Sequence, residues 1–340
     1  MVNIGLIGCG YWGPNLLRSF NSISDCRVQK VAELDAARLA YIQQNYPTVS
    51  ITKNYKDLLG SKIDAVVIAT PARTHFQFAK EAIQNKKHVL IEKPMAMTVK
   101  EAKELMALAQ KNRCKIMVGH TFEYNAAVRS LKKYIQNGTI GQPYYLYAQR
   151  LNFGIVRSDI NALWNLAPHD ISILLYLLEK MPLAVSARGD DFIQKGIEDV
   201  VFVVLYFPGD IMAHIHVSWL DPNKTRKLTV VGSEKMIVYD DVSDAKIQIY
   251  DKGIKKKNIK DSLGEYDDFA KFQTAKVAGD KTIPKIDFIE PLKTECAHFI
   301  DCILNDKTPL TDGLNGLRVV RVLEAAQESM KRNGQLINVK

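Results

Sequence analysis

The chain has 340 residues, 47% of them hydrophobic, and a formal net charge of +9 at pH 7. That length accommodates two domains, and no apolar run approaches the roughly 20 residues of a membrane span. We find no signal-peptide pattern at the N-terminus, and five cysteines without a CxxC pair favour reduced thiols in a cytoplasmic protein. Lysine and arginine are spread along the chain, with the densest cluster at 255–257, so the charge favours an anionic small molecule over nucleic acid.

The first 120 residues alternate short apolar strands with amphipathic helices. Strands are expected at 2–8, 26–34, 63–70, 88–94 and 115–120, and helical segments at 14–23, 35–46, 55–60, 75–86 and 99–112. This alternation is typical of βαβ crossovers and a parallel sheet covered on both faces. We therefore predict an α/β, doubly wound Rossmann domain over residues 1–122.

A glycine-rich loop lies between the first expected strand and helix. Gly8, Gly10 and Gly13 have the GxGxxG spacing of a dinucleotide site, in which the glycines allow a tight turn, approach to a pyrophosphate and close helix packing. The helix that follows directs its positive end toward phosphates. Tyr11 and Trp12 belong to the same loop, so we include them among the expected cofactor-binding residues.

An acidic residue follows 20 residues after the last of these glycines. Glu33 ends the second strand, where a carboxylate accepts hydrogen bonds from ribose hydroxyls and repels a 2′-phosphate, so NAD is favoured over NADP. The alternative is a solvated strand-end carboxylate. Asp35 competes for the same role but fits better as the cap of the next helix. Arg38 could accommodate a 2′-phosphate, which leaves NADP open.

The fourth expected strand, 88–94, ends in a lysine followed by proline. Ligands bind at the carboxyl ends of parallel strands, so Lys93 is placed to reach the reactive end of the cofactor and to polarise a substrate oxygen. A surface lysine before a turn is an equally good interpretation of this position alone.

The second half has a different pattern. An alternating strand is expected at 143–153, and residues 197–253 read as consecutive antiparallel strands with turns at 207–210 and 231–235. The last segment is helical and is expected to pack back on the body. Residues 171–178 form an apolar helix, with His169 held at its head by Pro168 and with Asp170 favouring its N-terminus.

Several polar residues of this half have two interpretations. His214 and His216 resemble a metal pair, but the apolar strand around them favours packing, and no metal site is expected. Amphipathic spacing accounts for Cys296, His298 and Cys302.

Arginines precede the apolar helix on a strand and loop. Arg150, Asn152 and Arg157 could clamp a phosphate or carboxylate of the substrate, or belong to a solvated loop. Lys224 and Arg226 present the same alternatives.

Four segments in order, IGLIGCGYWG, ATPARTHFQFAKEAI, VLIEKPMAMT and LAPHDISILLYLL, resemble the Gfo/Idh/MocA oxidoreductases over essentially the whole chain. The resemblance implies a second α+β domain over residues 123–340. Its large, mostly antiparallel open sheet would use one face for association into a homodimer or homotetramer.

The same resemblance implies roles for individual residues. Lys93 and His169 would lie beside the substrate next to the nicotinamide, with a cis bond between Lys93 and Pro94. The implied cofactor contacts are Thr70, Pro71, His75 and Glu92, and the implied substrate contacts are His120, Tyr124, Asn125, Trp164 and Asn165. One departure concerns Asn165, because many relatives carry aspartate four residues before the histidine. A mechanism that needs a carboxylate–histidine pair is thereby in doubt.

The expected activity is hydride transfer between NAD and a secondary hydroxyl or ketone of a sugar. His169, with a pKa near neutrality, would take the hydroxyl proton, and Lys93 would stabilise the alkoxide. A nucleotide-activated sugar oxidised at C3 is favoured, with a free polyol or cyclitol such as inositol as the alternative. A non-catalytic NAD-binding regulator is disfavoured, because a pure binder needs neither residue.

Overall fold

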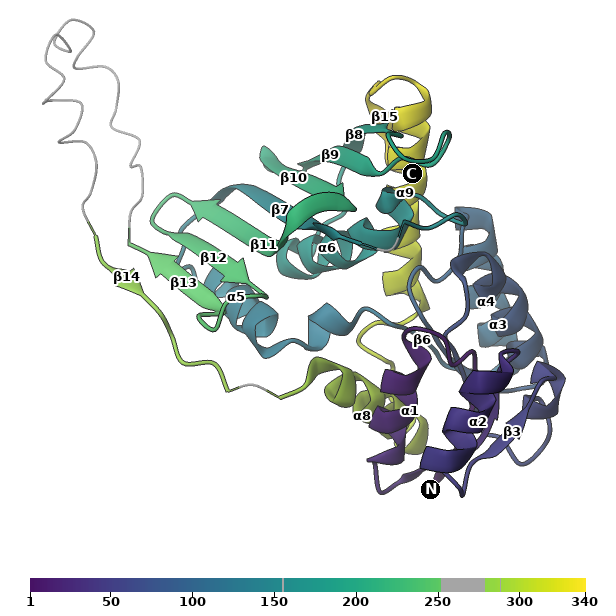
Figure 1. Ribbon diagram of the computed structural model, residues 1–340. Helices are drawn as coiled ribbons and strands as arrows, with labels where there is room; N and C mark the ends of the chain where they lie inside the picture. Colours follow the sequence, from purple (N-terminus) through teal and green to yellow (C-terminus); the bar gives the residue numbers. More distant parts are fainter. Residues whose placement is uncertain (155, 252–278, 288) are drawn as a thin grey trace, which may run out of the picture.

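The computed structural model describes residues 1–154, 156–251, 279–287 and 289–340. The lysine cluster at 255–257 lies outside the described residues. Two sheets organise the chain, with the N-terminal one at the lower right of Figure 1 and the larger one at the upper left. Helix α9 (Gly313–Lys331) runs from the larger sheet toward the N-terminal half and contacts both.

The first sheet is entirely parallel, in the order β3-β2-β1-β4-β5-β6. Its strands are β1 (Val2–Ile7), β2 (Cys26–Ala32), β3 (Ser50–Thr52), β4 (Ala65–Ile68), β5 (His88–Ile91) and β6 (Ile116–Val118). The strand order reverses at β1 and β4, so the carboxyl ends of these strands open a crevice there. The predicted Rossmann sheet is confirmed.

Helices cover both faces of this sheet. They are α1 (Gly13–Asn21), α2 (Ala36–Asn45), α3 (His75–Gln84) and α4 (Val99–Asn112), with 3₁₀ turns η1 (Tyr55–Leu58), η2 (Ala72–Thr74) and η3 (Thr121–Tyr124). The side chain of Asp35 accepts from the backbone N–H groups of Ala37 and Arg38, which confirms it as the cap of α2.

The second sheet is mixed and mostly antiparallel, in the order β14-β13-β12-β11-β7-β10-β9-β8-β15. The strands are β7 (Pro143–Phe153), β8 (Ala184–Asp190), β9 (Val200–Phe207), β10 (Ile211–Ser218), β11 (Leu220–Gly232), β12 (Met236–Asp240), β13 (Ile247–Tyr250), β14 (Lys281–Thr282) and β15 (Ile337–Asn338). Both predicted turns are confirmed, between β9 and β10 and between β11 and β12.

The prediction of a simple antiparallel series through 197–253 is wrong at one place. Strand β7 lies between β10 and β11, parallel to β10 and antiparallel to β11. Alternating hydrophobicity shows which residues form strands, but not which strands become neighbours. The long β7 therefore occupies a central position that the sequence pattern did not indicate.

Helices α5 (Ala126–Gln136), α6 (Ala162–Leu178), α8 (Pro291–Leu304) and α9 (Gly313–Lys331) complete the described structure. Helices α6 and α9 pack on one face of the second sheet, where they share its core. Helix α8 instead contributes Leu292, Cys296 and Phe299 to the core of the first domain, beside α1. The C-terminal helices therefore pack back on the body, as predicted, and they contact both halves of it.

The start of α6 corrects a second expectation. The helix begins at Ala162, with the side chain of Asn161 accepting from the N–H of Trp164, and it continues through Pro168. His169 therefore lies in the interior of the helix and not at its head. The cap at Asn161 sets the start of the helix, and the proline, already inside it, does not end it. Residues 171–178 are mostly buried, as predicted.

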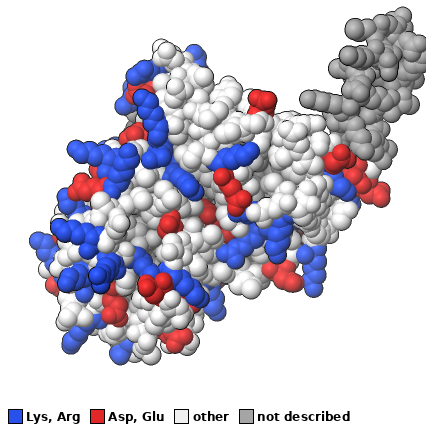
Figure 2. Space-filling view, turned by 180° about the vertical axis from the view of Figure 1, so that it is seen from behind, with Lys and Arg blue, Asp and Glu red and all other residues white. Residues whose placement is uncertain are grey.

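No helix in the described ranges has the length and apolar character needed to cross a membrane. Lysine and arginine side chains are scattered over the face shown in Figure 2, with aspartate and glutamate between them. The basic charge on this face is therefore dispersed and not gathered into one field.

Candidate active site

The glycine loop fits a dinucleotide. A Cβ at Gly8 would lie 2.7 Å from the carbonyl oxygen of Ala69, and one at Gly13 would lie 2.5 Å from that of Gly8. At Gly10 the nearest atom is the end of a flexible side chain, Nη1 of Arg38, at 3.1 Å. The backbone at Gly8 and Gly13 thus needs glycine for packing, while Gly10 leaves room for a pyrophosphate to approach.

The helix after this loop begins without a side-chain cap. Trp12 occupies the cap position but makes no side-chain hydrogen bond there, and Pro14 lies in the first turn, where its missing N–H costs nothing. The positive end of α1 is therefore available to a phosphate. Tyr11 is 84% exposed and borders the loop from the solvent side, whereas the side chain of Trp12, 37% exposed, approaches the buried Glu92 carboxyl.

The Glu33 carboxylate is directed toward the glycine loop. Its Oε2 accepts from the backbone N–H of Cys9 at 2.7 Å, and its Oε1 accepts from the N–H of Leu34 at 2.7 Å. The Arg38 guanidinium approaches the same carboxylate, with Nη1 4.0 Å from Oε2. Glu33 therefore lies between the loop and Arg38, close to where the Rossmann arrangement places the adenine ribose.

His75 joins two loops that leave the sheet. Its Nδ1 lies 2.7 Å from the carbonyl oxygen of Pro94 and its Nε2 lies 2.9 Å from that of Thr70. The Thr70 hydroxyl also pairs with Thr74 at 2.7 Å, and Pro71 starts the turn between them. The imidazole is fully buried, so its direct role in the structure is to hold the loop after β4 against the segment after β5.

Lys93 and Glu92 follow directly after β5, and the Lys93–Pro94 bond is cis, as predicted. The Lys93 amine donates to the backbone carbonyl of Asn165 at 2.7 Å. Burial lowers the pKa of Lys93; the Glu92 carboxyl opposes this shift and the Arg150 cation adds to it. Burial raises the pKa of Glu92, against the opposing Lys93 ammonium.

His169 belongs to the same buried centre. Its ring meets that of Phe122 edge-on at 5.1 Å between centroids, and its Nδ1 has no partner among the described residues. Burial lowers the pKa of His169 well below the usual histidine value, and the Lys93 and Arg150 cations lower it further. The expectation of a pKa near neutrality is therefore wrong, because burial and nearby positive charges both disfavour the imidazolium.

The environment of Asp170 corrects a further expectation. It does not favour a helix N-terminus, because it lies in the interior of α6 with its side chain buried. Its two carboxylate oxygens accept from Nε and Nη2 of Arg150, at 2.8 and 2.9 Å. The predicted anion clamp at Arg150 has a bidentate internal partner in the structure, and its role toward a substrate stays a prediction.

The other predicted substrate contacts are placed as follows. The Tyr124 hydroxyl pairs with that of Thr311, and Asn125 caps α5 and donates to the Tyr239 hydroxyl. The Trp164 indole donates to Gln327. The Arg157 guanidinium pairs with Asp159. The Asn165 side chain accepts from the Trp219 indole at 3.2 Å. Tyr124 therefore faces the core of the first domain, while Asn165 lies beside Lys93.

Sequence reasoning missed a group of buried acids next to this centre. Glu123 lies within η3, three residues after His120, which precedes that turn. Glu295 projects from α8 and accepts from the Thr121 hydroxyl at 2.7 Å. Burial raises the pKa of Glu123 to about 8 and that of Glu295 well above its usual value. In the sequence both read as polar positions of amphipathic helical segments, so no local pattern distinguishes them.

His214 and His216, for which a metal pair was the alternative to packing, both have an aromatic ring partner. Phe202 stacks on His214 and His216, with centroids 6.1 and 4.2 Å apart, on the outer face of the second sheet. Among the described residues, no three metal-ligating side chains cluster. Cys302 Sγ lies 3.4 Å from Nε2 of His298 on α8.

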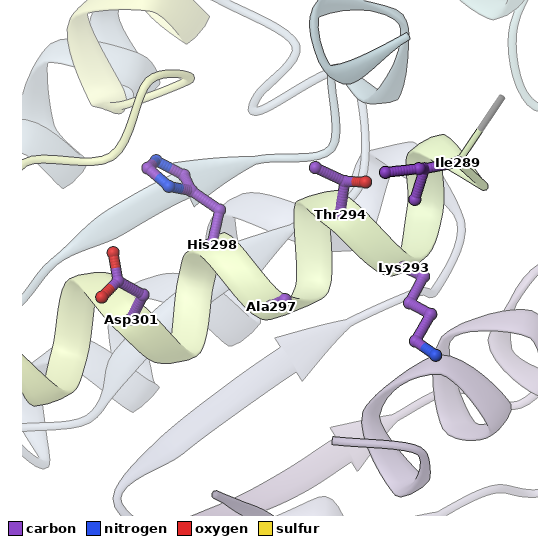
Figure 3. A pocket seen from close by; sticks show the side chains of 6 residues that line it. All are labelled: Ile289, Lys293, Thr294, Ala297, His298 and Asp301. Atoms are coloured by element: carbon purple, nitrogen blue, oxygen red, sulfur yellow. The ribbon is translucent and has the colours of Figure 1, made fainter. Parts of the chain in front are cut away.

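A surface hollow lies along α8 and differs from the candidate active site. Figure 3 shows its lining side chains, which come from this helix and the residues before it: Ile289, Lys293, Thr294, Ala297, His298 and Asp301. None of them belongs to the glycine loop or to the centre around Lys93. The hollow is therefore not the place where a nucleotide held by the glycine loop would react.

A parallel sheet with a glycine loop at its switch point is the arrangement of a dinucleotide-binding domain, and the partly buried lysine at a neighbouring strand end places a proton-transfer group beside it. Residues 2–120 match the model of an oxidoreductase family described as having an NAD-binding Rossmann fold, and residues 128–238 match the GFO/IDH/MocA C-terminal domain. The chain belongs to this Gfo/Idh/MocA family of NAD-dependent oxidoreductases. The predicted family, fold class and cofactor are confirmed.

Relatives with similar sequences are mostly named oxidoreductases or dehydrogenases, but a 2,7-anhydro-N-acetylneuraminate hydratase from Escherichia coli is also similar, at 25% identity over 63% of this chain and 60% of its own length. An uncharacterized oxidoreductase from Bacillus subtilis is 26% identical, over 96% of this chain and 93% of its own length. A UDP-N-acetylglucosamine 3-dehydrogenase from Acidithiobacillus ferrooxidans is 32% identical over 54% of this chain and 57% of its own. An inositol 2-dehydrogenase from Ralstonia nicotianae is 28% identical over 56% of each chain.

A solved structure of the Acidithiobacillus ferrooxidans dehydrogenase superposes on nearly the whole molecule. The TM-score is 0.80 at 22% identity, and the match covers 97% of this chain and 98% of the other. At this identity the similarity establishes the fold of both domains.

Proposed function

We propose that this protein passes a hydride between NAD and a secondary hydroxyl or ketone of a sugar, with Lys93 and His169 as the catalytic residues. The observation that carries the proposal is the partly buried Lys93 amine, held at 2.7 Å by the Asn165 carbonyl on the helix that carries His169. A lysine and an uncharged imidazole in one water-poor centre can bind and exchange the proton of a reacting hydroxyl. NAD supplies the hydride chemistry when it is bound.

The cofactor would be held by the glycine loop and the strand ends around it. The positive end of α1 would face the pyrophosphate, and Glu33 would accept from the adenine ribose. Thr70, Pro71 and Glu92 would border the nicotinamide half, with His75 keeping their two loops together. Glu92 Oε1 is buried without a partner in the described structure, so it is a ready acceptor for a ligand N–H or hydroxyl.

Lys93 and His169 divide the proton transfer between them. The lowered pKa of Lys93 brings its neutral amine within reach at mildly alkaline pH, so it can accept the hydroxyl proton during oxidation. In the opposite direction its ammonium donates that proton to the developing alkoxide. His169 is uncharged at neutral pH, and its free Nδ1 orients the substrate hydroxyl and relays the proton.

The substrate we favour is a nucleotide-activated sugar oxidised at C3. The net charge of +9 suits an anionic substrate, and Arg157 and Arg226 are half-buried cations whose charges act on Lys93. The relative that acts at C3 of UDP-N-acetylglucosamine supports this choice. A cyclitol is the second candidate, supported by the inositol 2-dehydrogenase relative.

We further propose a homodimer or homotetramer in a reducing, cytoplasmic setting. Tyr145, Phe202, Tyr206 and Met212 are exposed on the second sheet, on the face opposite α6 and α9. Such an apolar face is typical of subunit contacts. All five cysteines are free thiols, as expected for a reducing compartment.

The test is reduction of added NAD, followed at the absorbance of NADH, with separate panels of UDP-sugars, free sugars and inositols. NADH formation with a UDP-sugar and not with inositols supports the favoured substrate. Turnover of inositols alone would replace it with the cyclitol alternative. The proposed activity is wrong if no compound of the three panels reduces NAD and no ketone derived from these compounds reoxidises bound NADH.

A further inference from the structure

A buried polar chain links α9 to the active centre. Glu123 and His120 lie in and just before η3, and both are 1% exposed. Asn315, in the first turn of α9, lies between them. Its amide Nδ2 is 3.0 and 3.3 Å from the two carboxyl oxygens of Glu123, and its Oδ1 is 2.6 Å from Nδ1 of His120.

The orientation of the Asn315 amide sets the direction of these hydrogen bonds. The structure places its amide nitrogen toward the carboxyl oxygens of Glu123, to which it donates, and its amide oxygen toward His120. A carbonyl oxygen can only accept, so Nδ1 of His120 must carry a hydrogen. In the neutral imidazole, Nε2 is then a bare acceptor.

The surroundings keep the His120 imidazole neutral and its Nε2 unused. Burial lowers the pKa of His120 to about 4, the Asn315 hydrogen bond opposes this, and the Lys93 cation adds to it. Nε2 is buried and has no hydrogen-bond partner within the described parts of the chain. His120 follows β6, the neighbour of the strand that delivers Lys93, so this acceptor belongs to the same centre.

We propose that Asn315 is a positioning residue that holds His120 in the Nδ1–H tautomer, so that Nε2 accepts a hydrogen bond from a hydroxyl of the substrate. This inference rests on the proposed function for the identity of the donor, but the tautomer itself does not depend on it. The arrangement selects ligands that present a hydroxyl or N–H group at this point. A carbonyl or carboxylate oxygen there would face the lone pair of Nε2 and be rejected.

The tautomer is measured by long-range ¹H–¹⁵N correlation spectra of protein labelled at its seven histidines, with His120→Gln assigning the His120 signals. In the unsubstituted protein at neutral pH we expect a protonated Nδ1 and a bare Nε2. Asn315→Leu removes the acceptor, and we expect a mixture of tautomers or the Nε2–H form. Asn315→Asp offers a carboxylate to Nδ1–H, and we expect protonation of both nitrogens.

The matched control is Ser329→Ala, which removes another buried polar side chain of α9. Ser329 bonds to the backbone of Ala187 and Gln335, away from His120. Its substitution should leave the His120 signals unchanged. The proposal is overturned if unsubstituted His120 carries its proton on Nε2, or if the tautomer survives in Asn315→Leu.

The donor is tested with whichever sugar or cyclitol the protein oxidises. Asn315→Leu should lower kcat/KM by about tenfold, the effect of losing one hydrogen bond, while Ser329→Ala should not. An unchanged kcat/KM in the presence of an altered tautomer refutes the substrate contact. If no substrate is turned over, the proposed function fails, whereas the spectra still decide the tautomer.

Discussion

The side-chain amine of Lys93 donates to the main-chain carbonyl of Asn165 at 2.7 Å, while the Asn165 side chain accepts from Trp219 at 3.2 Å. The contact that holds Lys93 is therefore one that any residue at position 165 can make. An aspartate at this position would make the same main-chain contact and would add a negative charge near Lys93. We therefore expect the choice between asparagine and aspartate to change the electrostatics of the site and not its architecture.

Restoring a carboxylate in Asn165→Asp should shift the pH dependence of turnover upward. A negative charge near Lys93 favours its ammonium, so a higher pH is needed before the neutral amine accepts a hydroxyl proton. The pH profile of kcat in the oxidation direction measures this shift. Asn165→Leu is the control, because it keeps the main-chain carbonyl that accepts from Lys93. This variant should lose about 1 kcal/mol of stability with the Trp219 hydrogen bond. It should leave the inflection of the pH profile unmoved. An unmoved inflection in Asn165→Asp would refute the electrostatic account.

Removing Arg150 should strongly destabilise the fold. The Arg150–Asp170 pair is bidentate and nearly completely buried, and the guanidinium also lies 4.6 Å above the Phe122 ring. Arg150→Met leaves the Asp170 carboxylate buried without a cation, a cost of about 3–5 kcal/mol. Denaturant unfolding measures it.

Arg157→Met supplies the comparison for that measurement. The Arg157–Asp159 pair is also bidentate but partly exposed, so its loss should cost at most about 1 kcal/mol. Equal losses in the two variants would show that burial of the Arg150 pair is not the source of its contribution.

Stability should fall as the pH rises because of Glu123. Burial raises its folded-state pKa to about 8, above the value of about 4.3 in the unfolded chain, so between these pH values the folded state binds more protons. The contribution is complete below the unfolded pKa and is lost as pH rises to the folded pKa, with a slope of at most about 1.4 kcal/mol per pH unit.

Unfolding free energies measured from pH 5 to pH 8 test this relation. In Glu123→Gln the decline with pH should be shallower by one proton. Glu104→Gln, on the surface of α4, removes a carboxyl that pairs only with Lys80 and should keep the original slope. A Glu123→Gln curve parallel to that of the unsubstituted protein would contradict a protonated, buried Glu123.

The sequence was sufficient for the features that local patterns determine. The five predicted Rossmann strands, the glycine loop and the cap at Asp35 each depend on residues within a few positions of one another, and all are confirmed. The sixth strand, β3, has only three residues and was not predicted. Pro168 misled for the same reason. Proline usually marks a helix start, but here the cap lies seven residues earlier, at Asn161.

Features that depend on distant contacts were out of reach. The position of β7 between β10 and β11 follows from packing of the whole sheet. The Arg150–Asp170 pair joins a strand to a helix, and the Glu123–Asn315–His120 chain joins segments almost 200 residues apart. The pKa of His169 is lowered by burial and by cations from several of these segments. The residues next to it in the sequence therefore could not reveal that shift.

The central claim is that Lys93 and His169 perform the proton transfer while other residues hold NAD. The most direct measurement compares NAD affinity, by quenching of intrinsic fluorescence, with steady-state turnover in Lys93→Ala and His169→Ala. We predict that both variants bind NAD as the unsubstituted protein does and lose about 10²–10⁴-fold in kcat. Near-normal turnover in either variant, or loss of turnover that only follows loss of NAD binding, would contradict the account.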